Sequence, residues 1–195
     1  MRTPLVAIIG LPNGGKSTFF NKILARRTAL TYPEAGTTRD RAYGLTTWNH
    51  RSFYLIDTAG IVPNPDSDLE KNVQKQTRIA QAEADLILLM VDGRTPVAAV
   101  DRQLASQLGQ TGKPVILIVN KIDTRNAKTE AAAAEYLRLG LGEPFLVSSV
   151  NGAGLGDALD AITAELNRIL PTDDQAAEPM GLRIDFIGKP NVGKR

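Results

Sequence analysis

The chain has 195 residues, which leaves room for one ordinary α/β domain and a little more, and with 43% hydrophobic and 23% charged residues its composition is typical of a globular rather than a disordered chain. Its 23 basic and 21 acidic residues give a net charge of +2, so a DNA partner is not expected. No apolar run approaches the roughly 20 residues of a membrane span, the N-terminus lacks the layout of a signal peptide, and cysteine is absent. We therefore expect no membrane contact and a reducing, cytoplasmic setting.

A glycine-rich loop follows the first apolar run of the chain. Residues 5–9 lead into Gly10-Leu11-Pro12-Asn13-Gly14-Gly15-Lys16-Ser17, and apolar residues then recur at helical spacing over 18–24. A strand, the pattern G-x-x-x-x-G-K-S and a helix together predict a P-loop, in which backbone N–H groups and the helix dipole bind phosphate. The alternative is a glycine turn before a buried helix.

Each residue type in this loop has a chemical reason. Gly10 and Gly15 stand where a Cβ would block close approach of the backbone. Lys16 is expected at the β- and γ-phosphates and the Ser17 hydroxyl on Mg²⁺. The predicted nucleotide-binding residues of the loop are Asn13, Gly14, Gly15, Lys16, Ser17 and Thr18.

Strand and helix patterns alternate along the rest of the chain. Two β-like runs meet at a hairpin tip that holds His50, the only histidine, which we interpret as a solvated turn residue rather than a catalytic base. The alternation predicts a P-loop NTPase fold, with a mainly parallel six-stranded sheet, one antiparallel strand and helices on both faces. The expected strands are 5–9, 42–48, 52–56, 86–91, 115–119 and 145–147, and the expected helices are 18–24, 69–84, 97–108, 129–139 and 155–170.

A second phosphate-directed motif ends the third strand. Asp57-Thr58-Ala59-Gly60 matches the pattern D-x-x-G. This pattern alone is a weak indicator of a phosphate site, but it is a strong one at a strand end about forty residues after a P-loop. Asp57 is placed to hold the hydration shell of Mg²⁺, and the Gly60 backbone N–H to approach the γ-phosphate. Asp92, which ends the next strand, we interpret as a turn former.

The run Asn120-Lys121-Ile122-Asp123 predicts the base that is bound. Guanine presents N1–H and the 2-amino group side by side, and the one carboxylate of Asp123 can accept from both. Adenine would leave that carboxylate unpaired, which selects against it. We expect Asn120 at base N7 and the loop backbone, and the Lys121 stem over the ring. The backbone N–H groups of Ser148 and Ser149 are expected at guanine O6.

These motifs, with Gly36-x-Thr38-Arg39-Asp40-Arg41 and the Asn13 of the P-loop, resemble the translation-factor-related GTPases, and among them the double-GTPase family called Der or EngA. A second P-loop start at 188–194 strengthens the resemblance. It implies a GTPase domain over 1–170, an acidic linker over 171–181 and the start of a second GTPase domain over 182–195. Arg195 stands where that second loop needs its hydroxyl residue, so this copy is not expected to bind nucleotide as it stands.

The chain departs from the family pattern at several positions. Gly14 stands where the family has Val and is expected to loosen the loop. Ser149 replaces Ala, Thr37 replaces an apolar residue, and Ala59 stands where Der often has Gly.

The resemblance implies slow hydrolysis of GTP to GDP and phosphate. Catalytic roles fall to Lys16, Thr38 and Gly60, with Thr38 closing over Mg²⁺ and the γ-phosphate as the first switch. Ile61 follows Gly60, where many small GTPases carry a water-orienting glutamine. The resemblance suggests that K⁺ at Asn13 compensates; alternatively, Asn13 only shapes the loop. Arg39 is a less favoured internal arginine finger.

Three functions are compatible with these motifs. The first, by resemblance to Der, is a switch GTPase that acts in assembly of the large ribosomal subunit. The second is a related GTPase of the Era or tRNA-modification type, against which the second P-loop argues. The third is a nucleotide-binding interaction module with little hydrolysis, suggested by Gly14 and Ile61.

Overall fold

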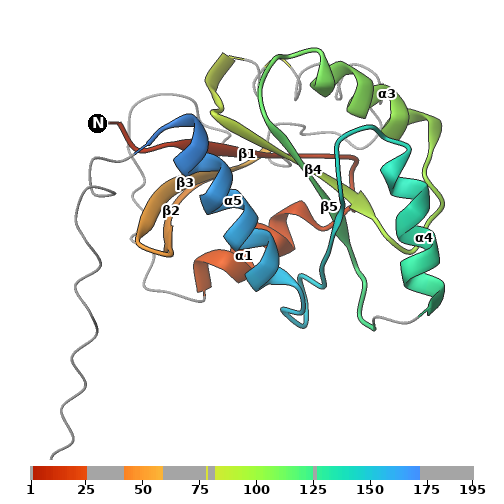
Figure 1. The fold of residues 1–195 in the computed structure, drawn as a ribbon. Coiled ribbons are helices and arrows are strands. Elements are labelled where there is room, and N and C mark those ends of the chain that lie inside the picture. Colours follow the sequence, from red (N-terminus) through yellow and green to blue (C-terminus); the bar gives the residue numbers. More distant parts are fainter. Residues whose placement is uncertain (1, 26–41, 59–77, 79–81, 125–126, 172–195) are drawn as a thin grey trace, which may run out of the picture.

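The structure is a computed structural model, and it describes residues 2–25, 42–58, 78, 82–124 and 127–171. Its strands are β1 (Leu5–Ile9), β2 (Ala42–Trp48), β3 (Arg51–Asp57), β4 (Leu86–Asp92), β5 (Val115–Asn120) and β6 (Phe145–Leu146). Its helices are α1 (Lys16–Ala25), α3 (Ala99–Gly109), α4 (Ala127–Leu137) and α5 (Leu155–Ile169). Figure 1 shows their arrangement.

The six strands form one sheet in the order β2-β3-β1-β4-β5-β6. Neighbouring strands are parallel throughout, except that β2 pairs with β3 in the antiparallel sense. The predicted sheet is thereby confirmed. Because five strands run the same way, the carboxyl ends of β1, β3, β5 and β6 meet at one edge, where sheets of this kind bind ligands.

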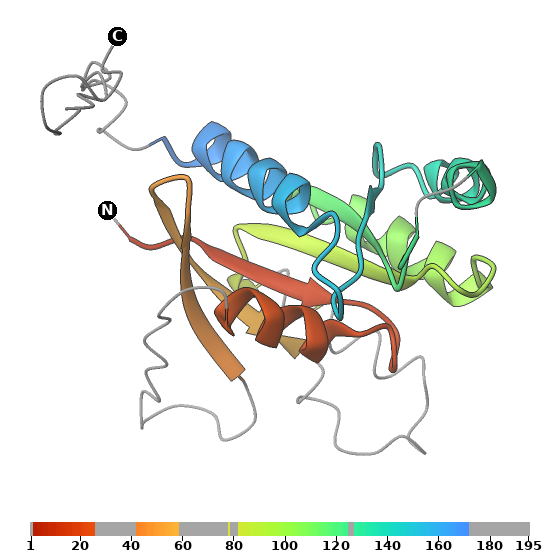
Figure 2. The same cartoon turned by 90° about the horizontal axis from the view of Figure 1, so that it is seen from below.

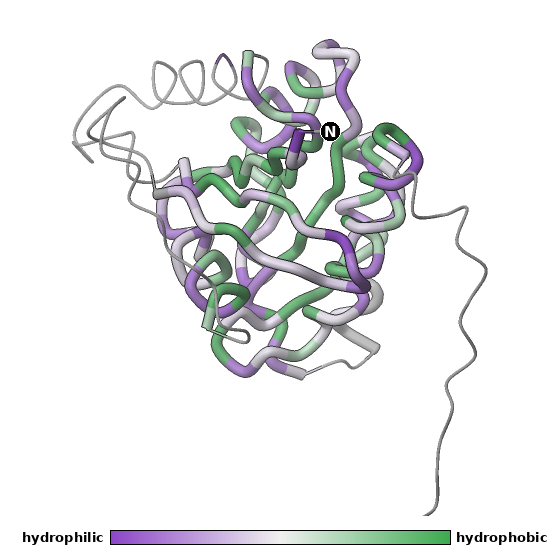
Figure 3. Tube along the Cα trace, turned by 90° about the vertical axis from the view of Figure 1, so that its left-hand side faces the viewer, coloured by the Kyte–Doolittle hydropathy of each residue, from purple (hydrophilic) through white to green (hydrophobic). Residues whose placement is uncertain are grey.

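Apolar side chains fill both faces of the sheet, as the unbroken apolar runs of β1 and β4 require of strands covered on both sides. On one face, Phe19 and Ile23 of α1 share a core with Leu155 and Ile162 of α5. On the other, Leu104 of α3 and Tyr136 of α4 pack against β4 and β5. Figure 3 shows the hydrophobic segments running through the middle of the molecule.

The last helix, α5, buries one apolar face. Its residues Leu155, Ala158, Leu159, Ile162 and Leu166 are buried, and Ile169 packs against the same core. Burial of each large side chain contributes about 1.5–3 kcal/mol, so this face fastens the helix to the sheet.

The β2–β3 hairpin has the predicted tip. Asn49 and His50 form a two-residue turn with φ of 45° and 61°, the left-handed pair that suits the twist of a hairpin. His50 is exposed, as a turn residue should be. Arg51, which we placed in the turn, begins β3 because it pairs with Trp48.

Several predicted boundaries shift by one or two residues. The helix expected over 97–108 begins at Ala99, since Asp101 Oδ2 accepts a hydrogen bond from the Ala98 N–H at 3.0 Å and so caps its first turn. The helix expected over 129–139 is α4. Of the helix predicted over 69–84, the structure describes only 78 and 82–84, and it is helical at 78, 82 and 83.

Within the described residues, no helix is long and apolar enough to cross a bilayer.

Candidate nucleotide-binding site

The predicted P-loop connects β1 to α1, and α1 turns back in the direction opposite to β1 (Figure 2). Lys16, the first residue of α1, is buried, and its Nζ donates hydrogen bonds to the backbone oxygens of Gly10 and Leu11, both at 2.8 Å. Burial lowers the pKa of Lys16 to about 8, and the negative charge of Asp57 partly offsets that effect. The ammonium group is therefore held under the loop beside a carboxylate.

Two glycines of the loop are required by their neighbours. Gly10 has φ +153° and lies so close to β4 that a Cβ would overlap the Met90 carbonyl oxygen. Gly15 has φ +91°, and its Cβ would overlap the Asn120 amide nitrogen. We predicted close backbone approach at both positions, and the structure identifies the groups that are approached.

The side chains expected to face a ligand lie on the open side of this loop. Asn13, Ser17 and Thr18 are exposed, and Asn13 has a left-handed φ of 63°. Gly14 has no left-handed φ, and a Cβ there would meet the Leu11 carbonyl oxygen at 3.3 Å. The backbone conformation at position 14 therefore does not require glycine. The extra flexibility expected of Gly14 comes only from its lack of a side chain.

Two oxygen ligands suited to Mg²⁺ come from the end of β3, which carries Asp57, and from the first turn of α1, which carries Ser17. Asp57 ends β3 and pairs in register with Ile8 of β1, just before the loop that carries Ser17. A hydroxyl and a carboxylate are hard oxygen ligands, and Mg²⁺ in nucleotide sites takes one or two protein ligands together with phosphate oxygens. The donor set therefore fits a magnesium–nucleotide complex. Next to it, the buried Thr58 Oγ1 donates to the Ile8 carbonyl oxygen at 2.6 Å and joins the two strand ends.

Asn120 connects three of the predicted motifs. It is 1% exposed, and its Nδ2 donates to the Gly14 carbonyl oxygen at 2.9 Å. Its Oδ1 accepts from the Ser149 N–H at 3.0 Å and from the Ser149 hydroxyl at 2.8 Å. The expected bond from Asn120 to the loop backbone is therefore present, and Ser149, the departure from the family's Ala, contributes an extra donor.

The carboxylate of Asp123 lies at the same edge. Its Oδ1 accepts from Ser148 Oγ at 2.8 Å and from Asn151 Nδ2 at 3.2 Å. Its Oδ2 accepts from the Arg94 guanidinium at 2.7 Å. The Ser148 bond, followed by the Arg94 bond, lowers the pKa of Asp123, so the group stays an anionic acceptor at neutral pH.

Lys121 has a partner that the sequence did not indicate. Its Nζ donates to Asp92 Oδ2 at 2.6 Å, and the backbone of Lys121 has a left-handed φ of 66°. Asp92 is also a turn former as predicted, since its Oδ1 accepts from the Arg94 N–H at 3.0 Å. Asp92, Arg94 and Asn151 were missed as site residues because no local pattern marks them; their partners lie 28 or 29 residues away.

Some predicted site residues lie outside the described residues. These are Thr38 with the rest of the first switch, Gly60 with Ile61, and the second P-loop at 188–194. Their roles stay predictions.

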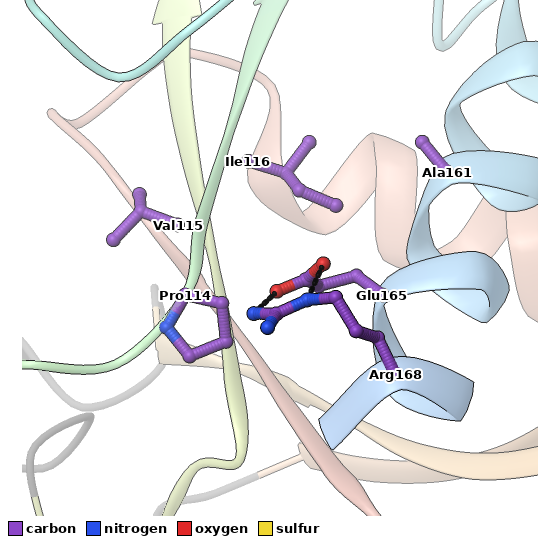
Figure 4. Close-up of a pocket in the computed structure, with 6 residues that line it drawn as sticks. All are labelled: Pro114, Val115, Ile116, Ala161, Glu165 and Arg168. Carbon is purple, nitrogen blue, oxygen red and sulfur yellow. Dashed lines mark hydrogen bonds and ion pairs between the residues drawn. The ribbon is translucent and has the colours of Figure 1, made fainter. Parts of the chain in front are cut away.

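A shallow hollow of about 370 Å³ lies around Val115, at the start of β5 (Figure 4). A bidentate ion pair lies in it, in which Arg168 Nε and an Arg168 terminal nitrogen donate to Glu165 at 2.9 and 2.6 Å. The hollow is lined by Pro114, Val115, Ile116, Ala161, Glu165 and Arg168. Because Val115 begins β5 and Asn120 ends it, the hollow is separate from the nucleotide motifs.

The fold and the site together are those of a P-loop GTPase domain. The chain belongs to the family described as 50S ribosome-binding GTPases, whose model matches residues 5–121. It is 44% identical to the GTPase Der of Herpetosiphon aurantiacus over 100% of this chain and 43% of that protein. It is 45% identical to the GTPase Der of Christiangramia forsetii over 97% of this chain and 42% of that protein. The resemblance to the Der family is thereby confirmed.

The chain spans less than half the length of these curated relatives. Among solved structures, the elongation factor SelB of Methanococcus maripaludis matches with a TM-score of 0.64 and 17% identity, over 87% of this chain and 35% of that one. The G domain of the T. maritima FeoB iron transporter matches with a TM-score of 0.59 and 25% identity, over 84% of this chain and 98% of that one. The first likeness shows the fold alone.

Proposed function

We propose that this chain binds guanine nucleotides and hydrolyses GTP to GDP and phosphate by in-line attack of water on the γ-phosphate. The observation that carries the proposal is the position of Asn120. Its one side chain joins the Lys16 loop to the Ser149 loop, so phosphate-directed and base-directed groups lie at one edge of the sheet. The similarity to Der proteins over the whole chain supports the same activity.

The residues take distinct roles in this proposal. The Lys16 ammonium exchanges its two carbonyl partners for phosphate oxygens and stabilises the charge that spreads during transfer. Ser17 and Asp57, with Thr38 in the triphosphate state, would hold Mg²⁺, which supplies further neutralisation of the phosphates when bound. The Gly60 N–H would address the γ-phosphate.

Base selection is assigned to Asp123. Its carboxylate accepts from guanine N1–H and the 2-amino group, and an adenine nucleotide would leave it without those donors. The second Asn120 amide hydrogen, which faces Met90 Sδ at an N···S distance of 3.8 Å, would turn to base N7. The Lys121 stem would lie over the ring, and the Ser148 and Ser149 N–H groups would address O6.

The test is nucleotide preference. Asp123→Asn replaces one acceptor by a donor, so preference should move from GTP towards XTP in binding and in turnover. Glu143→Gln, at an exposed position outside the site, is the matched control and should leave preference unchanged. An Asp123→Asn protein that still preferred GTP would refute the pocket assignment.

Turnover is expected to be slow, because Ile61 cannot orient water. We propose that K⁺ held in part by Asn13 raises the rate. GTP hydrolysis measured in KCl and in NaCl at equal ionic strength tests this, and equal rates would remove K⁺ from the proposal.

We further propose that the chain acts in the cytoplasm, in assembly of the large ribosomal subunit. Support comes from the family description and the Der relatives, and not from any contact within the chain. The proposed organisation is a GTPase domain over 1–170, a linker over 171–181 and the start of a second GTPase domain over 182–195. Co-sedimentation with purified 50S subunits in the presence of GTP or GDP tests the partner, and limited proteolysis within 171–181 tests the linker.

A further inference from the structure

The carboxylate assigned to guanine already has a cationic partner. Arg94 donates from its guanidinium to Asp123 Oδ2 at 2.7 Å, while Ser148 and Asn151 donate to the other oxygen. Both oxygens of Asp123 are therefore hydrogen-bonded within the protein. A base that presents two donors has to share or replace one of these partners.

The backbone that carries Arg94 is held in place by the base-recognition segment. The Gly93 N–H donates to the Asn120 carbonyl oxygen at 2.8 Å, and Asp92 accepts from both the Arg94 N–H and the Lys121 ammonium, at 3.0 and 2.6 Å. A Cβ at Gly93 would lie 2.8 Å from the Asn120 carbonyl oxygen, which is fixed backbone, so this close packing favours glycine.

A buried tyrosine supports the same turn from α4. The Tyr136 hydroxyl bonds to the carbonyl oxygens of Asp92 and Thr95, both at 3.2 Å, and the residue is 3% exposed. The turn 92–95 is therefore hydrogen-bonded to both β5 and α4, and this fixes the backbone from which Arg94 reaches Asp123.

The Arg94 side chain itself is not enclosed. It is 63% exposed, and the Asp123 side chain is 44% exposed. An ion pair this open to water is weak, so the guanidinium can leave the carboxylate while its backbone stays fixed.

We propose that Arg94 competes with the base for Asp123, occupying Oδ2 until guanine displaces it. The inference rests on the proposed function and deepens it. Guanine can replace the arginine because its N1–H and 2-amino group offer the same kind of donors to the carboxylate. Adenine has an acceptor at N1 and no 2-amino group, so it cannot donate a hydrogen bond to Asp123 in place of the one from Arg94.

Competition of this kind predicts that removal of the guanidinium tightens guanine binding. Arg94→Ala and the longer Arg94→Gln should each bind fluorescent GDP about two- to fivefold more tightly than the wild type, which is the range an exposed ion pair allows. Arg138→Ala removes an exposed arginine that follows α4 and should leave the affinity unchanged. Binding of fluorescent ADP should stay undetectable in all four proteins.

Salt provides a second readout. Screening weakens an exposed ion pair, so the ratio of wild-type to Arg94→Ala dissociation constants should shrink towards one between about 50 mM and about 500 mM KCl. In an Asp123→Asn background, Arg94→Ala should have no further effect on binding of fluorescent XDP, since the anionic acceptor is gone.

Each outcome has one meaning. If the wild type binds no guanine nucleotide, the proposed function fails, and this inference fails with it. If the wild type binds GDP but both Arg94 variants bind it equally well or more weakly, the competition model alone is wrong. A ratio that does not change with salt would also overturn the inference.

Discussion

Asn120→Ala is the substitution that tests the architecture of the site most directly. The buried asparagine makes three hydrogen bonds to oxygen and nitrogen partners, the Gly14 carbonyl oxygen and the N–H and hydroxyl of Ser149, and a longer one of 3.8 Å to Met90 Sδ. Alanine makes none of them. The Gly14 carbonyl and the Ser149 N–H would then lie buried without a partner, whereas the Ser149 hydroxyl can rotate to another acceptor.

The cost follows from these two stranded groups. Each buried polar group left without a partner costs about 1–3 kcal/mol, and partial entry of water reduces the sum, so we expect a loss of about 2–4 kcal/mol in the free energy of unfolding. Ser149→Ala removes one of the three bonds and strands no backbone group, so it should cost about 1 kcal/mol or less. Domains of this size are stable by about 5–15 kcal/mol, so both variants should still fold.

Urea unfolding, followed by circular dichroism, measures these differences. The dependence of the unfolding free energy on urea should be the same in all proteins, so that the midpoint reports stability. Asn151→Ala is the matched control, because its exposed amide makes one bond of 3.2 Å to Asp123; it should change stability by less than about 0.5 kcal/mol. A loss below about 1 kcal/mol for Asn120→Ala, or retained GDP affinity, would show that Asn120 does not join the two loops as argued.

Three further substitutions test other parts of the molecule. Gly15→Ala should lose GDP binding and at least about 2 kcal/mol of stability, because its φ is +91° and its Cβ would overlap a buried amide; Gly109→Ala, which has open space, should be neutral or slightly stabilising. Tyr136→Phe should cost about 1 kcal/mol, because it removes the one hydroxyl hydrogen that the Asp92 and Thr95 carbonyl oxygens share. Burial raises the pKa of Tyr136 to about 12, so the stability contributed by its protonated hydroxyl is complete below pH 10 and is lost as the pH rises towards 12. Over that interval the wild type should lose unfolding free energy relative to Tyr136→Phe. Parallel curves of stability against pH for the two proteins would contradict this. Asp160→Ala should cost about 1 kcal/mol or less, since its bond to Trp48 Nε1 is exposed, and a change in tryptophan fluorescence should accompany it.

The periodicity of the sequence was sufficient for most of the fold. Unbroken apolar runs marked β1, β4 and β5 because strands covered on both faces have no polar side. Two β-like runs separated by a short polar segment marked the hairpin, and the left-handed backbone of Asn49 and His50 is seen only in the structure. Helix ends were less accurate, as at α3, where the Asp101 cap decides the first turn.

The site was predicted as a set of motifs and not as a network of contacts. The bond from Asn120 to the P-loop was anticipated, but the partners of Asp123 and Lys121 were not. Arg94 and Asp92 bear no pattern of their own, and each lies 29 residues from the residue it contacts. Only the pairing of β4 with β5, with Asp92 opposite Asn120, brings them together.

By itself, the sequence determined the secondary-structure types and the chemistry of each motif, because those depend on residue type and on local spacing. The tertiary structure decided which side chains hold one another at the edge of the sheet where the motifs meet. Strand order sets those distances, and it arises from the packing of residues far apart in the chain. For this reason the ion pair between Arg94 and Asp123 becomes apparent only in the folded protein.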